Sequence, residues 1–266
     1  MSREPRPTPA QLGNTIAQEL RIAGNRRGIL ELGHRYRAFM AENFPEGDPR
    51  KLKHGYAFKL STSLARTVAD SLRADFPGVL PGIDGRGGES AAPVHSGFKR
   101  LDVNYSTQQL GLALGVSIKT LNFPDEGSGR FTKNATRIDN ELRAEAQDYH
   151  HRQPYCVLAA LIFVPEATVR DHGSRGRTSF RHIYETLSKR AGRQDHAGPH
   201  DRFELVYLIT YEDDENSPSF GRMRLTEVRA PTDATDEPAD ATTFDDLIRA
   251  IGTTFQTRNP HHRLAR

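Results

Sequence analysis

The stretch LDVNYSTQQLGLALGVSIKTLNF, Leu101–Phe123, holds one aspartate near its start and one lysine near its end. No residue between Asp102 and Lys119 is charged, although 27% of the whole chain is. Apolar and β-branched residues predict two strands here, at 98–105 and 112–123. Charges kept in such apolar strands are expected to pair with each other or to hold something, such as a metal ion.

Helical spacing and chain breakers predict the elements around these two strands. The expected helices are Thr8–Ala23, Ile29–Phe44, Tyr56–Phe76, Arg137–His151, Ser179–Ala191 and Thr243–Phe255. The further expected strands are Tyr155–Val164, Glu204–Tyr211 and Arg222–Arg229. Glycine and proline predict loops at 81–97 and 124–136, and 230–241 reads as an acidic linker. Helices that alternate with apolar strands predict an α/β fold.

The composition bounds the class of protein. With 266 residues the chain can bury a substantial core, and 37 basic against 34 acidic residues leave a net charge of +3. Basic residues predominate before Arg73, so this part is expected to lie along phosphates or simply to solvate helix faces. The chain lacks a long apolar run and a signal-peptide pattern, which predicts a soluble, cytoplasmic protein with no membrane partner. The single cysteine, Cys156, is interpreted as a core residue.

The helix expected at 137–151 carries carboxylates on the side that should face the sheet. On a helical wheel an apolar stripe is formed by Ile138, Leu142 and Tyr149. Glu145 lies in the middle of this stripe, and Glu141 lies one turn earlier on the same flank. The helix could therefore present two carboxylates to the sheet edge of Asp102 and Lys119. Oxygen ligands around a lysine suit Mg²⁺ or Mn²⁺ and a phosphodiester, because the metal activates water and the lysine offsets developing charge.

This order of elements resembles the core of the PD-(D/E)xK nucleases, the restriction-endonuclease-like superfamily. The resemblance covers about Tyr56–Val164 and is carried by a helix, a strand with Asp102, a strand that ends in Ser117-Ile118-Lys119, a helix and an apolar strand. It implies a mixed central sheet flanked by helices. It also implies that Asp102 binds a Mg²⁺ or Mn²⁺ ion and that Lys119 assists the attacking water.

Ser117 departs from the family pattern, which has Asp, Glu or sometimes Gln two residues before the lysine. Serine is a poor ligand for a hard divalent ion. Some members of the superfamily carry this acid on the neighbouring helix, so the resemblance makes Glu145 the leading replacement and Glu141 the next. An additional acid upstream would be Glu89, as a metal ligand, or Asp70.

The polar loop GSGRFTKNATR, residues 127–137, suits a nucleic-acid partner. Its candidate contacts to phosphates, base edges and stacked bases are Arg130, Phe131, Lys133, Asn134 and Arg137. The alternative is an ordinary surface loop in which Thr136 or Asp139 caps the following helix. Only the adjacent charged site favours the first interpretation.

The resemblance also implies a function and a division of the chain. It predicts a metal-dependent DNA endonuclease of bacterial restriction or anti-phage defence, acting alone, as a homodimer, or as the nuclease subunit beside a helicase or sensor. The expected regions are N-terminal helices at 1–80, whose last helix joins the core, a nuclease core at 81–230, and a linker, helix and tail at 231–266. The alternatives are a nuclease that cleaves RNA and a non-catalytic binding or scaffold module. Ser117 is the feature that favours the binding or scaffold module. A purely structural alternative for the charges is an ordinary ion pair of Asp102 with Lys119, with Glu145 paired with an arginine.

Overall fold

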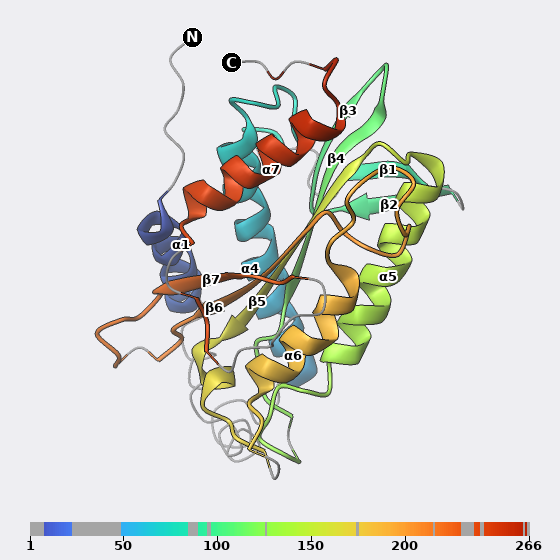
Figure 1. Cartoon of the computed structure of the whole chain (residues 1–266). Helices are drawn as coiled ribbons and strands as arrows, with labels where there is room; N and C mark the ends of the chain where they lie inside the picture. The colour runs from blue at the N-terminus through green and yellow to red at the C-terminus, as the bar shows by residue number, and fades with distance from the viewer. Residues whose placement is uncertain are drawn as a thin grey trace.

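The computed structural model describes residues 8–22, 49–84, 90–94, 97–125, 127–173, 176–214, 216–229, 237–239, 242–262 and 264. They form a mixed α/β protein in which a five-stranded sheet lies between two layers of helices (Figure 1). The helix expected at 29–44 lies outside the described residues. So do most of the linker expected at 230–241 and the candidate ligand Glu89.

The central sheet is mixed. Its strands, in spatial order, are β3 (Val103–Thr107), β4 (Gly111–Thr120), β5 (Val157–Pro165), β6 (Leu205–Tyr211) and β7 (Met223–Glu227). The three inner strands are parallel, and each edge strand is antiparallel to its neighbour. Every residue of β5 and β6 is buried, so these strands read as continuous apolar runs without alternation.

Helices cover both faces of the sheet (Figure 1). One face packs against α1 (Pro9–Ile22), α4 (Pro49–Leu72) and α7 (Phe244–Arg258), and the other against α5 (Ala135–Arg152) and α6 (Ser179–Leu187). Two short 3₁₀ helices follow β5 and α6, namely η3 (Glu166–Val169) and η4 (Ser188–Arg190). The apolar residues accordingly form two cores, one on each side of the sheet.

Strand β4 alternates between these two cores. Val116 and Ile118 belong to the core beneath α4 and α7. Ser117 and Lys119 therefore face the opposite side, toward α5, as the period of a strand predicts. This alternation decides where the candidate site lies.

The region before β3 differs from the prediction. The loop expected at 81–97 contains the strand β1 (Ser90–Val94), which pairs with β2 (Gly97–Leu101) in a separate antiparallel hairpin beside α5 (Figure 1). The strand expected at 98–105 is divided between β2 and β3 by a bend at Asp102. Glycine and proline indicate a loop by local preference alone, whereas pairing with a distant segment decides this hairpin.

The C-terminal helix is part of the main body of the fold. The apolar residues of α7 are fully buried in the core beneath α4: Phe244, Leu247, Ile248, Ile251 and Phe255. The short helix expected after the linker thus packs against the central sheet. Cys156 is 1% exposed and lies in the other core, as expected. No helix in the described part of the chain is long and apolar enough to cross a membrane.

Candidate active site

Strand β4 and helix α5 bring three candidate residues together. Ser117 Oγ donates a hydrogen bond to Glu145 Oε2 at 2.7 Å, and Lys119 Nζ donates one to Glu145 Oε1 at 2.6 Å. Each oxygen of this carboxylate is thus held by a different side chain of the same strand. Glu145 faces the sheet, as the helical wheel predicts, and its carboxylate lies beside the serine at the position where the PD-(D/E)xK pattern has an acid.

The pair between Lys119 and Glu145 is largely shielded from water. The two side chains are 19% and 17% exposed, and Ser117 is 1% exposed. Opposite charges attract more strongly in such a site than at a solvated surface, where a pair contributes little. The geometry of the carboxylate is therefore well defined by its two partners.

Asp102 lies at the bend between β2 and β3. Its Oδ2 accepts a hydrogen bond from the backbone N–H of Ile118 at 2.7 Å. The β3–β4 ladder begins at the pair of Val103 and Val116, so the carboxylate bonds to β4 just beyond the point where the two strands part. This contact places Asp102 next to the segment that carries Lys119.

The charges around Lys119 determine its protonation. Burial lowers the pKa of the ammonium, but the charge and hydrogen bond of Glu145, and then the charges of Asp102 and Glu141, raise it by more. The net pKa lies above that of an ordinary lysine, so Lys119 is an ammonium at neutral pH. Tyr149, one turn after Glu145 on α5, is fully buried, and burial followed by the charge of Glu145 raises its pKa as well.

Glu141 forms the outer part of the same site. Its Oε2 lies 3.6 Å from Lys119 Nζ, and its Oε1 lies 3.8 Å from Arg137 Nε. Its side chain is 41% exposed, more than twice as much as that of Glu145. The cluster of Asp102, Ser117, Lys119, Glu141 and Glu145 is called the Lys119 cluster below.

The structure describes one of the two upstream acids, and that one lies away from the cluster. Glu89 lies outside the described residues. Asp70 belongs to α4, on the other face of the sheet, and its Oδ1 pairs with Arg73 at 2.7 Å. Asp70 was a candidate ligand in the sequence, but in the structure it is one partner of a surface ion pair.

The loop before α5 divides into an internal part and an exposed part. Phe131 is 6% exposed, and the Arg130 guanidinium donates hydrogen bonds to the carbonyl oxygens of Asp171 and Arg177 at 3.2 and 2.7 Å. Arg130 thereby anchors the loop to Asp171 and Arg177, and the Phe131 backbone N–H donates to Ser179 Oγ at 3.1 Å, so both predicted contacts are used within the protein itself. Phe131 is buried and the Arg130 guanidinium binds backbone carbonyl oxygens, although their polar neighbours in the sequence suggested that both side chains are exposed.

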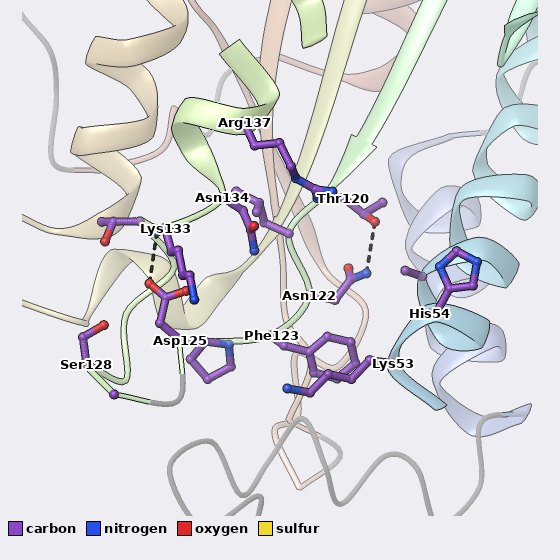
Figure 2. A pocket seen from close by; sticks show the side chains of 15 residues that line it. Lys53, His54, Thr120, Asn122, Phe123, Asp125, Ser128, Lys133, Asn134 and Arg137 are labelled. Carbon is purple, nitrogen blue, oxygen red and sulfur yellow. Dashed lines mark hydrogen bonds between the residues drawn. The ribbon is translucent and has the colours of Figure 1, made fainter. Parts of the chain in front are cut away.

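The exposed part of the loop lines a groove of about 990 Å³ at the end of β4, called the β4-end groove (Figure 2). Lys53 and His54 of α4 lie on one side, and Lys133, Asn134 and Arg137 lie on the other, with Phe123 between them. The last three predicted contacts thus share one surface. The residues from α4 and Phe123 were not predicted, because only the packing of α4 against the sheet brings them there. The basic start of α4 was their only sequence signal.

The donor set of the Lys119 cluster fits a divalent metal only in part. No group of three or more Asp, Glu, His or Cys side chains within the described ranges is placed to hold a metal ion. Asp102 and Glu145 offer two carboxylates beside one ammonium. Mg²⁺ is commonly held by one or two carboxylates, with water and substrate phosphate as its other ligands. The cluster suits that mode and not a metal held by protein side chains alone.

The chain was compared with known proteins at three levels. No family model, curated protein or solved structure matches it. The functional interpretation therefore rests on the geometry described above and on the resemblance of the sequence pattern.

Proposed function

We propose that this chain is a metal-dependent endonuclease that hydrolyses DNA phosphodiesters at the Lys119 cluster. The observation that carries the proposal is the position of the Glu145 carboxylate, within hydrogen-bonding distance of both Ser117 and Lys119. Helix α5 thereby supplies an acid where the strand has a serine. Asp102 supplies a second acid at the bend before β3. This arrangement supports a restriction-endonuclease-like site whose second acid has moved to the helix.

The side chains of the cluster take distinct roles in the proposed reaction. Protonated Lys119 places a positive charge beside the scissile phosphate and stabilises the negative charge that develops on it. Ser117 orients Glu145, and the Ile118 N–H orients Asp102. Because Lys119 already carries its proton, the proton of the attacking water goes to a carboxylate. Glu141 suits this step, because its side chain is more exposed than that of Glu145 and lies farther from its cationic partners.

Asp102 and Glu145 are the residues that would hold a Mg²⁺ or Mn²⁺ ion, together with water and an oxygen of the substrate phosphate. The bound ion would supply the positive charge that polarises the phosphoryl group and acidifies the attacking water. Glu145 would then have to share its oxygens between the metal and its present partners. The hydrogen bond from Ser117 keeps the carboxylate directed toward β4 during this exchange.

One observation favours a second candidate function, a non-catalytic nucleic-acid-binding module. Both oxygens of Glu145 are engaged by side chains of the chain itself, so the cluster is a complete ion-pair network as it stands. In that case the charges stabilise the junction of β4 and α5, and the β4-end groove carries the function. An RNA-cleaving nuclease would use the same cluster and would differ in substrate alone.

The biological setting follows from the resemblance. The proposed role is bacterial restriction or anti-phage defence, with the chain acting alone, as a homodimer, or as the nuclease subunit beside a helicase or sensor. These partners belong to the proposal and are separate from the chemistry at the Lys119 cluster.

The proposal is tested by cleavage assays on the purified chain. Plasmid, linear duplex DNA, single-stranded DNA and RNA are incubated with Mg²⁺ or Mn²⁺, beside the variants Asp102→Asn, Lys119→Gln and Glu145→Gln. We expect metal-dependent cleavage of DNA and losses of about 100-fold or more in each variant. Glu227→Gln is the charge-matched control, because it removes a carboxylate from β7, the edge strand farthest from β3, and should cleave normally.

The outcomes separate the candidates. Cleavage lost in Asp102→Asn and Lys119→Gln but retained in Glu145→Gln would move the second ligand to Glu141. Cleavage of RNA alone would change the substrate class. Failure of the folded wild-type chain to cut any substrate would contradict the nuclease proposal and favour the binding module.

A further inference from the structure

The β4-end groove has an excess of positive charge from two separate elements. Lys53 projects from α4, Lys133 from the loop before α5, and Arg137 from the first turn of α5 (Figure 2). The acid in the groove, Asp125, is partly used inside the loop, since its Oδ2 accepts a hydrogen bond from the Lys133 backbone N–H at 3.0 Å. Within the described part of the chain the Lys133 ammonium has no ion-pair partner. Cations fixed on two walls suit a polyanion that lies between them.

The groove also contains one aromatic surface. Phe123 is half-buried, and its ring packs edge-on against Tyr56 with the ring centroids 5.7 Å apart. The Lys53 ammonium lies 5.4 Å from the Phe123 centroid. These two contacts hold the ring in place where it lines the groove. Proteins that bind single strands combine such rings with positive grooves, because an unpaired base stacks on an aromatic face whatever its sequence.

The start of α5 adds to the same surface. Its N-cap, Asn134, makes no side-chain hydrogen bond to the helix, and the first turn holds no acidic residue. The N-terminal end of an 18-residue helix carries a partial positive charge and amide groups that a phosphate oxygen can accept from. This contribution reinforces the three cationic side chains and does not stand alone.

The groove lies next to the Lys119 cluster. Arg137 lines the groove and contacts Glu141 at 3.8 Å, and Glu141 in turn lies 3.6 Å from Lys119. Thr120, the last residue of β4, also lines the groove and directly follows Lys119. A chain of phosphates in the groove would thus run toward the cluster.

We propose that the β4-end groove binds a single-stranded segment of nucleic acid, with phosphates at Lys53, Lys133 and Arg137 and one unpaired base stacked on Phe123. A base inside a duplex has no free face for this ring, so the groove selects unpaired nucleotides. This proposal deepens the proposed nuclease function. It rests on that function only in treating the bound strand as a substrate. Binding itself requires neither metal nor cleavage.

The test is fluorescence anisotropy with labelled oligonucleotides of about 12 nucleotides, within the usual site size for single-strand binders. Single-stranded DNA, RNA of the same sequence and the DNA duplex are titrated with the full chain in EDTA, which prevents metal-dependent cleavage. We expect both single strands to bind more tightly than the duplex, and the tighter of the two identifies the natural source of the strand. Binding should weaken as salt rises from about 50 to 200 mM.

Three variants localise the binding. Phe123→Leu should weaken single-strand binding about 5- to 100-fold, because a stacked base loses its ring. Lys53→Gln and Lys133→Gln should each weaken binding and lower the slope of log affinity against log salt by about 0.7. Lys59→Gln is the matched control, since Lys59 is an exposed lysine of the same helix that does not line the groove. Thermal unfolding confirms that each variant remains folded.

The results decide the inference independently of cleavage. Wild-type affinity in Lys53→Gln and Lys133→Gln, or tighter binding of the duplex, would overturn it even if the protein proved to be a nuclease. Binding in EDTA that falls in the groove variants, without cleavage in Mg²⁺, would support the groove and refute the nuclease. Absence of single-strand binding by the wild-type chain would also overturn the assignment.

Discussion

At the scale of single residues, Ser117 of β4 and Glu145 of α5 together place a carboxylate at the end of the strand. Ser117 has no carboxylate, but its hydroxyl donates to Glu145 Oε2, so the acid reaches the strand from the helix. Lys119 holds the other oxygen and remains protonated. In the proposed site, the position of the acid matters more than the element that carries it.

An exchange of the two residues tests this point. In the double variant Ser117→Asp, Glu145→Gln, the amide of the new glutamine can donate to the new carboxylate, which reverses the hydrogen bond between the two positions. We expect Glu145→Gln alone to lose metal-dependent cleavage by about 100-fold and the double variant to recover part of it. Cleavage rates at several Mg²⁺ concentrations measure the recovery.

The Ser117→Asp single variant is the control for this exchange. It places two carboxylates side by side in a largely buried site, so we expect a lower free energy of unfolding. A double variant that is folded but as inactive as Glu145→Gln would show that the helix position of the acid is essential.

At the scale of elements, the packing of α7 depends on how the helix begins. Thr243 and Asp246 form a capping box in which Thr243 Oγ1 accepts from the Asp246 N–H at 3.1 Å and Asp246 Oδ2 accepts from the Thr243 N–H at 3.0 Å. The two side chains satisfy backbone groups that the helix leaves unpaired. The box fixes the first turn and directs Phe244 into the core.

Removal of this cap should destabilise the protein measurably. Thr243→Ala is expected to lower the free energy of unfolding by about 1 kcal/mol, because the Asp246 N–H loses its acceptor at the first turn. Urea denaturation followed by circular dichroism measures the change. Thr253→Ala makes the same substitution at an exposed position inside α7 and should be neutral or slightly stabilising. Equal effects of the two substitutions would contradict a capping role.

At the scale of the whole molecule, one buried carboxylate joins several distant segments. Glu204 Oε1 accepts hydrogen bonds from Arg193 and from Arg258 of α7, each at 2.7 Å. Its Oε2 accepts from the Leu158 N–H of β5 at 2.8 Å and lies 3.4 Å from His150 of α5. The Glu204 side chain is 1% exposed, so these charges compensate one another with almost no help from water.

Neutralising Glu204 should weaken the entire fold. Glu204→Gln leaves two buried guanidinium groups without their counter-charge, and a loss of about 3–5 kcal/mol in the free energy of unfolding is expected. Denaturant unfolding at neutral pH measures it. Glu227→Gln, which breaks an exposed pair with Arg229, should change the stability by about 1 kcal/mol or less. Similar losses in the two variants would contradict the role assigned to the buried network.

The same residue should make stability depend on pH. Burial raises the pKa of Glu204, but His150, the Leu158 N–H and Arg193 lower it by more, so the net pKa is below the usual 4.5. A carboxyl group whose pKa is lowered by folding stabilises the native state above its unfolded pKa and loses that effect as the pH falls through the folded value. The difference in unfolding free energy between the wild type and Glu204→Gln should therefore shrink below about pH 4.5. A difference that stayed constant from neutral to acid pH would refute this linkage.

Several features of the fold could be predicted because they depend on neighbours along the chain. The alternation of β4 placed Ser117 and Lys119 on one face, and the helical period placed Glu145 toward the sheet. Features that depend on pairing across the chain were not predicted. The hairpin β1–β2 lies where glycine and proline indicated a loop, and Phe131 is buried where its polar neighbours indicated exposure.

The sequence by itself determined the α/β class, most of the helices and strands, and which faces of β4 and α5 carry charge, because periods of two and 3.6 residues express those choices locally. Only the tertiary structure decided that Glu145 meets Ser117, 28 positions earlier in the chain, and that α4 and the loop before α5 enclose one groove. Register, layer order and the bend at Asp102 set those contacts. They arise from packing between segments distant in sequence, which no local pattern encodes.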